Sequence, residues 1–165
     1  MNNIDIAKGI VFQKLSIKKE TFNDRLISQK KVYLLQGLGT DLGYSYNWYV
    51  RGPYSPVLAK YIYKNHDLLS DYDYSGIHLR EEAARNIDTV NKMENDKPTD
   101  LDVASWYELL ASMLFAFSNK SAWDVDTGKE DDVIKKLLEH KPQYSYDQCI
   151  DAVKTLKKNS YRAVE

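Results

Sequence analysis

The stretch that decides the fold runs over residues 29–61 and reads QKKVYLLQGLGTDLGYSYNWYVRGPYSPVLAKY. It begins in a helical pattern, passes through a tyrosine-rich extended segment and ends in a Gly-Pro turn that opens another helix. The extended part, residues 44–50, is rich in β-forming aromatic residues and lies between Gly43 and Gly52, so it predicts a short strand. Its expected pairing partner is residues 75–79. The stretch therefore predicts a small two-stranded element among helices.

Helical periodicity dominates the rest of the chain. The most apolar pattern, residues 101–117, predicts the central core helix, because its large apolar residues recur at intervals of three, four and seven. The sequence therefore predicts a mainly α fold, an α+β arrangement in which one compact domain over residues 1–165 holds six to seven helices and a small two-stranded β element. The other expected helices cover residues 4–15, 24–38, 56–68 and 81–94, a segment around 133–138, and a last segment that opens at residue 145.

Residues that cap helices mark several of these boundaries. Ser55 is a suitable N-cap, and Pro56 after it suits the first helical position because it has no N–H to satisfy. Ser145 followed by Gln148 forms a capping-box pattern. The remaining candidate caps are Thr21 or Asn23 for the second helix and Thr99 or Asp100 for the core helix.

Composition excludes several classes of protein. With 43% hydrophobic and 28% charged residues, the chain matches neither a disordered nor a fibrous protein. A net charge of −1 removes the bulk-charge argument for nucleic acid or membrane surfaces. A lone cysteine, Cys149, does not fit a disulfide-stapled secreted domain, and we find neither a signal peptide nor a membrane-spanning stretch. We therefore expect a cytoplasmic protein without a membrane partner.

Polar residues on the 24–38 helix have two expected roles. Lys30 and Lys31 flank the apolar arc and are expected to keep their ammonium groups in water. Gln29 and Gln36, seven residues apart, lie on the opposite side of the helix.

One acidic segment matches part of a calcium-binding loop. Residues at positions 1, 3, 5, 6 and 12 of an EF-hand loop carry oxygen ligands or the sharp-turn glycine. His78 stands at position 8, where an apolar residue is usual, and no second loop follows, so we interpret the match as a coincidence and predict no metal site. The matching residues are Asp71, Asp73, Ser75, Gly76 and Glu82.

No other pattern indicates chemistry. The acidic run over residues 124–128 places its glycine one position too early for calcium and is interpreted as a solvated turn. His66, His78 and His140 lack metal-ligand spacing. Cys149 has no neighbouring base and is expected to be a buried, unreactive thiol. We therefore predict no catalytic residues and no cofactor.

The turn over residues 51–56 allows two interpretations. Free N–H groups at the helix that opens at Pro56, together with Arg51, can hold an anion or a partner's carboxylate. Alternatively, Gly52 and Pro53 only set the shape of the turn. The sequence leaves both open.

Three motifs carry a resemblance to known proteins. They are Gln-Lys-Lys-Val-Tyr-Leu-Leu over residues 29–35, Leu-Gly-Tyr over 42–44, and Gly-Pro-Tyr-Ser-Pro over 52–56 followed by Leu-Ala at 58–59. With these motifs the chain resembles the YwgA-like uncharacterised proteins and, more distantly, the SocA-type antitoxin (Panacea) domain. The core helix and the Lys-Pro pair at 141–142 also fit the YwgA-like layout.

That resemblance implies a mainly helical, intracellular protein of bacterial or mobile-element origin. Such a protein works by binding another protein, typically a toxin, and not by turnover. We expect a non-enzymatic antitoxin-like or adaptor protein, since aromatic and arginine side chains are favoured anchors of protein interfaces. The expected partner-binding residues are Tyr46, Trp48, Arg51, Gly52, Pro53 and Tyr54.

Two other functions stay open. A winged-helix-like regulator that binds nucleic acid is compatible with a helix, helix, strand, helix, strand order and with a local excess of four basic residues before Val32. An enzyme would need Tyr33, Lys30, Arg51 and an acid such as Asp41 to converge. The basic residues counted are Lys8, Lys14, Lys18, Lys19, Arg25, Lys30 and Lys31, against Asp5, Glu20 and Asp24.

Overall fold

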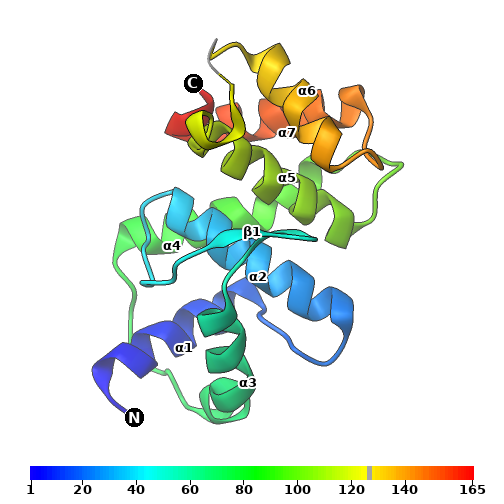
Figure 1. Ribbon diagram of the computed structural model, residues 1–165. Coiled ribbons are helices and arrows are strands. Elements are labelled where there is room, and N and C mark those ends of the chain that lie inside the picture. The colour runs from blue at the N-terminus through cyan, green and yellow to red at the C-terminus, as the bar shows by residue number, and fades with distance from the viewer. Residues whose placement is uncertain (126–127) are drawn as a thin grey trace.

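The most apolar segment of the chain forms the central helix of the fold, α5 (Val103–Ser118). In the computed structural model, which describes residues 1–125 and 128–165, α5 runs between the N-terminal elements and the helices α6 and α7 (Figure 1). Trp106, Tyr107 and Leu110 of α5 are completely buried. The prediction that this segment is the core helix is confirmed.

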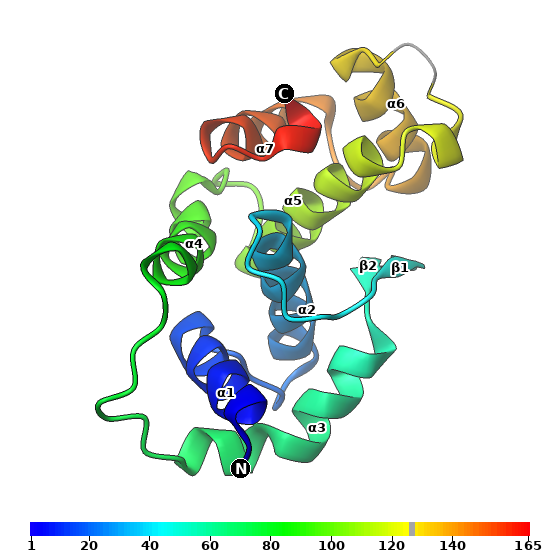
Figure 2. The same ribbon diagram turned by 90° about the vertical axis from the view of Figure 1, so that its left-hand side faces the viewer.

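Seven α-helices and one two-stranded antiparallel sheet make up the described part of the chain, so the predicted mainly α fold is confirmed. Helix α1 packs against α3 and α4, and α2 packs against α5 (Figure 2). Short 3-10 turns follow α4, α5 and α7. The elements are α1 (Asn3–Leu15), α2 (Phe22–Gly37), β1 (Asn47–Tyr49), β2 (Gly52–Tyr54), α3 (Pro56–Asp71), α4 (Glu81–Lys92), η1 (Met93–Asp96), α5, η2 (Ser121–Trp123), α6 (Glu130–His140), α7 (Tyr146–Lys158) and η3 (Arg162–Val164).

Side-chain caps start the helices largely as predicted. Thr21 caps α2, and Ser145 caps α7 in a capping box with Gln148. The hydroxyl of Ser55 accepts a hydrogen bond from the Leu58 N–H at the start of α3. The predicted N-cap of α5, Thr99 or Asp100, is wrong. Asp102 caps this helix, and its side chain accepts a hydrogen bond from the Ser105 N–H at 2.7 Å.

The strand pairing differs from the sequence prediction. Strand β1 pairs with β2 and not with residues 75–79, which form no strand. Val50 and Arg51 make a two-residue turn, and Gly52 follows with φ at 88°, a conformation that glycine adopts readily. The hairpin is favoured because pairing adjacent segments closes a much shorter loop than pairing across α3.

This hairpin also changes the order of elements. Both strands precede α3, so the order is helix, helix, strand, strand, helix. The order that would permit a winged-helix arrangement is therefore not the one observed. Within the described residues, no helix has the length and apolar character needed to cross a lipid bilayer.

Candidate functional site

Polar side chains of α2 form hydrogen bonds with the backbone of the β1–β2 hairpin and of the residue that follows it. The side-chain amide of Gln29 donates to the Ser55 carbonyl at 2.9 Å, and its oxygen accepts from the Ser55 N–H at 3.0 Å. Gln29 is only 3% exposed. Gln36 does the same for the preceding loop, since its oxygen accepts from the N–H groups of Leu42 and Tyr44. The two glutamines therefore bind loop backbone and do not form a solvated helix face.

Lys30 is completely buried beneath the hairpin, so the prediction that its ammonium group lies in water is wrong. Its Nζ donates to the Pro53 carbonyl at 2.7 Å. Burial lowers the pKa of Lys30 to about 7, although the nearby negative charge of Glu108 opposes that shift. The hairpin and α5 cover this face of α2, and a backbone carbonyl takes the place of water as hydrogen-bond partner.

The prediction for Lys31 is also wrong. Its Nζ donates to the Leu15 carbonyl at 2.9 Å and to Asn91 Oδ1 at 3.1 Å. Burial lowers the pKa of Lys31 from its usual value. This lysine therefore ties α2 to the end of α1 and to α4, which leaves two fewer basic side chains for any partner.

A buried ion pair holds the turn of the hairpin from the other side. Lys141 Nζ lies 3.1 Å from Glu108 Oε1, and both side chains are 2% exposed. Lys141 also donates to the Val50 carbonyl at 2.7 Å, while the Tyr144 hydroxyl donates to Glu108 Oε2 at 2.7 Å. Because each charge has a partner, the cluster fixes the hairpin without leaving a buried charge unpaired.

Outside this anchored hairpin lies a cavity of about 710 Å³, which we call the hairpin groove. It is formed by the loop before α2, the first half of α2, the hairpin and the first half of α3. Leu26, Ala59 and Ile62 supply aliphatic surface inside it, and Phe22 and Tyr63 are exposed aromatic residues at its edge. The groove is large enough to accept side chains of a partner.

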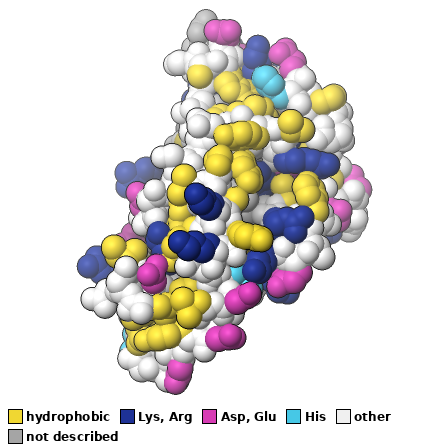
Figure 3. Space-filling model, turned by 60° about the horizontal axis from the view of Figure 1, so that its bottom comes forward, with side chains coloured by type: hydrophobic (Ala, Val, Ile, Leu, Met, Phe, Trp, Pro, Cys, Tyr) yellow, Lys and Arg dark blue, Asp and Glu magenta, His cyan; other side chains and the backbone are white. Residues whose placement is uncertain are grey.

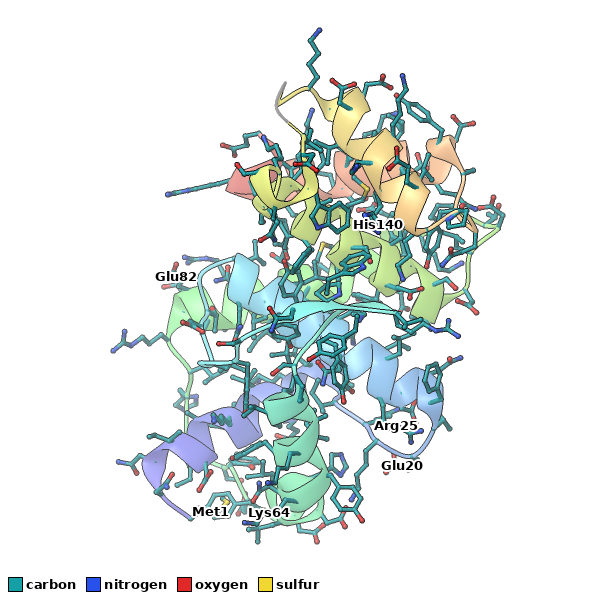
Figure 4. All side chains as sticks on the ribbon, in the orientation of Figure 1. Met1, Glu20, Arg25, Lys64, Glu82 and His140 are labelled. Atoms are coloured by element: carbon teal, nitrogen blue, oxygen red, sulfur yellow. The ribbon has the colours of Figure 1, made fainter. Side chains whose placement is uncertain are left out.

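Basic side chains gather around the apolar groove. On the face shown in Figure 3, lysine and arginine side chains alternate with hydrophobic ones. The guanidinium of Arg51 lies 5.4 Å above the Phe22 ring, and Lys19 Nζ lies 5.6 Å above the Tyr63 ring. Figure 4 shows Arg25 next to Glu20 at the start of α2, where Arg25 donates to the Lys19 carbonyl at 2.9 Å.

The structure divides the predicted partner-binding residues into groups. Arg51 and Tyr54 line the hairpin groove. Gly52 and Pro53 are buried and form the strand that Lys30 holds. The groove also contains residues that the sequence did not single out. Among them are Phe22, at the start of α2, and Tyr63 of α3. The sequence signalled them only through its surplus of tyrosine and other aromatic residues.

Tyr46 and Trp48 lie away from the groove. The Tyr46 hydroxyl donates to the Gln29 carbonyl at 3.0 Å, and its ring packs 4.9 Å from that of Tyr33. Trp48 packs against Trp123 at 4.8 Å and against His140, whose ring lies at the end of α6 (Figure 4). Both are half-buried and belong to an aromatic cluster that joins the hairpin to α5 and α6.

The four groups considered for an enzyme do not converge. Lys30 and Arg51 border the hairpin groove, whereas Tyr33 lines a second cavity of about 740 Å³ beside α5 and the C-terminal turn. Asp41 accepts a hydrogen bond from the Gly43 N–H in an exposed loop and lines neither cavity. Cys149 is buried as predicted, and burial raises the pKa of its thiol to about 11.

The calcium-like segment is a loop with internal hydrogen bonds. Asp73 accepts from the N–H and the hydroxyl of Ser75, while Asp71 ends α3 and Glu82 is the second residue of α4. Among residues 1–125 and 128–165, no group of three or more His, Cys, Asp or Glu could hold a metal ion. The second acidic run includes Asp126 and Thr127, which lie outside the described residues.

Comparison of the chain with protein-family models, with curated proteins and with solved structures finds no match. The resemblance to YwgA-like proteins and to the SocA-type antitoxin domain therefore stays a prediction.

Proposed function

We propose that this chain is a non-enzymatic protein-binding module that captures another protein in the hairpin groove, as toxin-neutralising antitoxins and adaptors do. The observation that carries the proposal is the groove itself, an apolar cavity edged by exposed aromatic residues and arginine. A few hot-spot residues supply most of the binding energy in protein interfaces, and these are enriched in tryptophan, tyrosine and arginine. Of the four residues considered for an enzyme, Lys30 and Arg51 line this groove and Tyr33 lines the other cavity.

The buried polar cluster supports this proposal. Gln29, Lys30 and Lys141 bind the backbone of the hairpin and its flanks at four points. A surface that is already fixed in the free protein loses less conformational freedom when a partner binds. The hairpin is therefore suited to present Arg51 and Tyr54 in a constant geometry.

The resemblance supports a cytoplasmic protein of a bacterium or mobile element, with a toxin as the partner. A single buried thiol agrees with a reducing compartment.

The test is binding to the protein encoded by the adjacent gene, after the two proteins are expressed together. Arg51→Ala and Tyr63→Ala should each weaken the affinity about tenfold or more, because both side chains lie at the groove. The matched control is Lys64→Ala, an exposed α3 residue that does not line the groove. Equal affinity for all three variants would contradict the groove as the binding surface.

Nucleic-acid binding is the second candidate, favoured by the basic side chains around the groove. Phosphate contacts would make the affinity fall steeply between about 50 mM and 200 mM salt. A DNA or RNA affinity with that dependence, lost in Arg51→Ala, would favour this candidate over protein binding.

A further inference from the structure

The charge around the hairpin groove is one-sided. Its lining includes four basic side chains near the surface and one acidic side chain, Glu20, although the whole chain carries a net charge of −1. The basic residues are Lys18, Lys19, Arg25 and Arg51.

Two of these cations have neither an ion pair nor a side-chain hydrogen bond in the part of the chain that the structure describes, whereas Arg25 donates to backbone carbonyls. Within the described residues, neither the Lys18 ammonium nor the Arg51 guanidinium makes an ion pair or a hydrogen bond, and both residues are exposed. Lys19 differs, since its Nζ lies 3.5 Å from Asp67 Oδ2. The groove therefore offers at least two cations to an anionic partner.

The interior of the groove has a different character. Leu26, Ala59 and Ile62 form an aliphatic surface inside it. The exposed rings of Phe22 and Tyr63 extend this apolar surface outward. An occupant that satisfies both features has large apolar side chains between carboxylates.

We propose that the hairpin groove binds a peptide segment of the partner that carries aspartate or glutamate beside a phenylalanine, tryptophan, tyrosine or leucine. This inference rests on the proposed function and adds the chemistry of the partner to it. The apolar side chain enters the groove between α2 and α3. The flanking carboxylates lie against Arg51 of the hairpin and Lys18 of the loop before α2.

A nucleic acid fits the groove less well. A phosphate backbone requires cations along its length, whereas the inside of this groove is aliphatic. Single-stranded bases could stack on Phe22 and Tyr63, so an oligonucleotide serves as the competing ligand in the test.

The experiment uses the full chain and a displayed library of random peptides of about 12 residues. Peptides selected by the wild-type protein are synthesised with a fluorescent label, and their affinity is measured by anisotropy. Three versions of the best peptide are compared: the original, one with amides in place of its carboxylates, and one with alanine in place of its aromatic or leucine residues.

We expect the selected peptides to be rich in Asp and Glu and to contain at least one large apolar residue. Both altered peptides should bind about tenfold or more weakly. The double variant Lys18→Glu, Arg51→Glu should lose affinity to the same extent. The control Lys64→Glu should retain it, since Lys64 lies at the bottom of the molecule, away from Arg25 and Glu20 (Figure 4). The altered peptides keep the test valid if the double variant does not fold.

Three results would overturn the inference: no peptide is selected, the selected peptides have no acidic bias, or a labelled single-stranded oligonucleotide displaces them and binds more tightly. The proposed function can fail separately. If the neighbouring gene's product binds and depends on Tyr63 while no acidic peptide does, the inference is wrong and the function stands. If acidic peptides bind but no protein partner does, the inference stands and the proposed function is wrong.

Discussion

At the scale of single residues, Gly52 combines a positive φ with a close approach to α5. Its φ is 88°, and a Cβ added there would lie 2.5 Å from Ser112 Oγ on α5. We expect Gly52→Ala to lower the free energy of unfolding by roughly 1–3 kcal/mol, through backbone strain and the close contact. Denaturant unfolding of the variant measures this loss.

Ser112 allows the two causes to be separated. Its buried hydroxyl has no hydrogen-bond partner in the described structure, so Ser112→Ala alone should change stability by less than about 1 kcal/mol. In the double variant the close contact is relieved and the strain stays, so part of the Gly52→Ala loss should be recovered. A double variant as unstable as the sum of both single variants would show that the contact is unimportant.

At the scale of elements, Gln29 replaces a missing backbone partner for the segment between β2 and α3. We expect Gln29→Leu to cost about 1–3 kcal/mol, because it leaves the buried Ser55 N–H without a hydrogen bond, whereas the Ser55 carbonyl keeps the bond that it accepts from the Ala59 N–H. Hydrogen exchange of the Ser55 amide should accelerate. The control is Gln13→Leu, an exposed position on α1. Unchanged exchange at Ser55 in Gln29→Leu would contradict this role.

The helices could be predicted from the sequence because their signals are local. Thr21, Ser55 and Ser145 each cap a helix through residues three positions away, and the apolar spacing of α5 is visible without any tertiary contact. The hairpin was missed because the aromatic run over residues 44–50 favoured a longer strand. The short pairing depends on the turn at residues 50–51 and on support from α2.

The groove could be predicted only in part. Arg51 and Tyr54 follow from the turn sequence, whereas Phe22 and Tyr63 reach the same cavity through the packing of α2 and α3. Burial of Lys30 could not be seen either. Its partner is the Pro53 carbonyl, a backbone group 23 positions away. Every residue has a backbone carbonyl, so nothing in the sequence marks this one as the partner of Lys30.

At the scale of the whole molecule, the buried lysine makes stability depend on pH. Burial lowers the pKa of Lys30 from 10.5 to about 7, so between these values the unfolded chain binds more protons than the folded chain. The free energy of unfolding should therefore rise from about pH 7 to pH 9, by at most roughly 1.4 kcal/mol per pH unit for one proton. The lowered pKa values of Lys31 and Lys141 act in the same direction.

Groups with raised pKa values limit this rise at higher pH. Burial raises the pKa of Cys149 to about 11, and that of Tyr44 to about 12, so above about pH 9 the unfolded chain releases protons that the folded chain retains. Urea unfolding of the wild type and of Lys30→Met between about pH 7 and pH 9 tests the assignment to Lys30. A smaller slope is expected in the variant, and an identical slope would assign the dependence to other groups.

The most direct measurement of the central claim is hydrogen exchange of the chain alone and with its partner bound. We expect the partner to slow exchange in residues 18–30, 49–54 and 59–63, the three segments that form the hairpin groove. Exchange in α6 and α7 should stay unchanged. Protection confined to α6 and α7, with none in these three segments, would contradict the claim that this protein binds its partner through the groove.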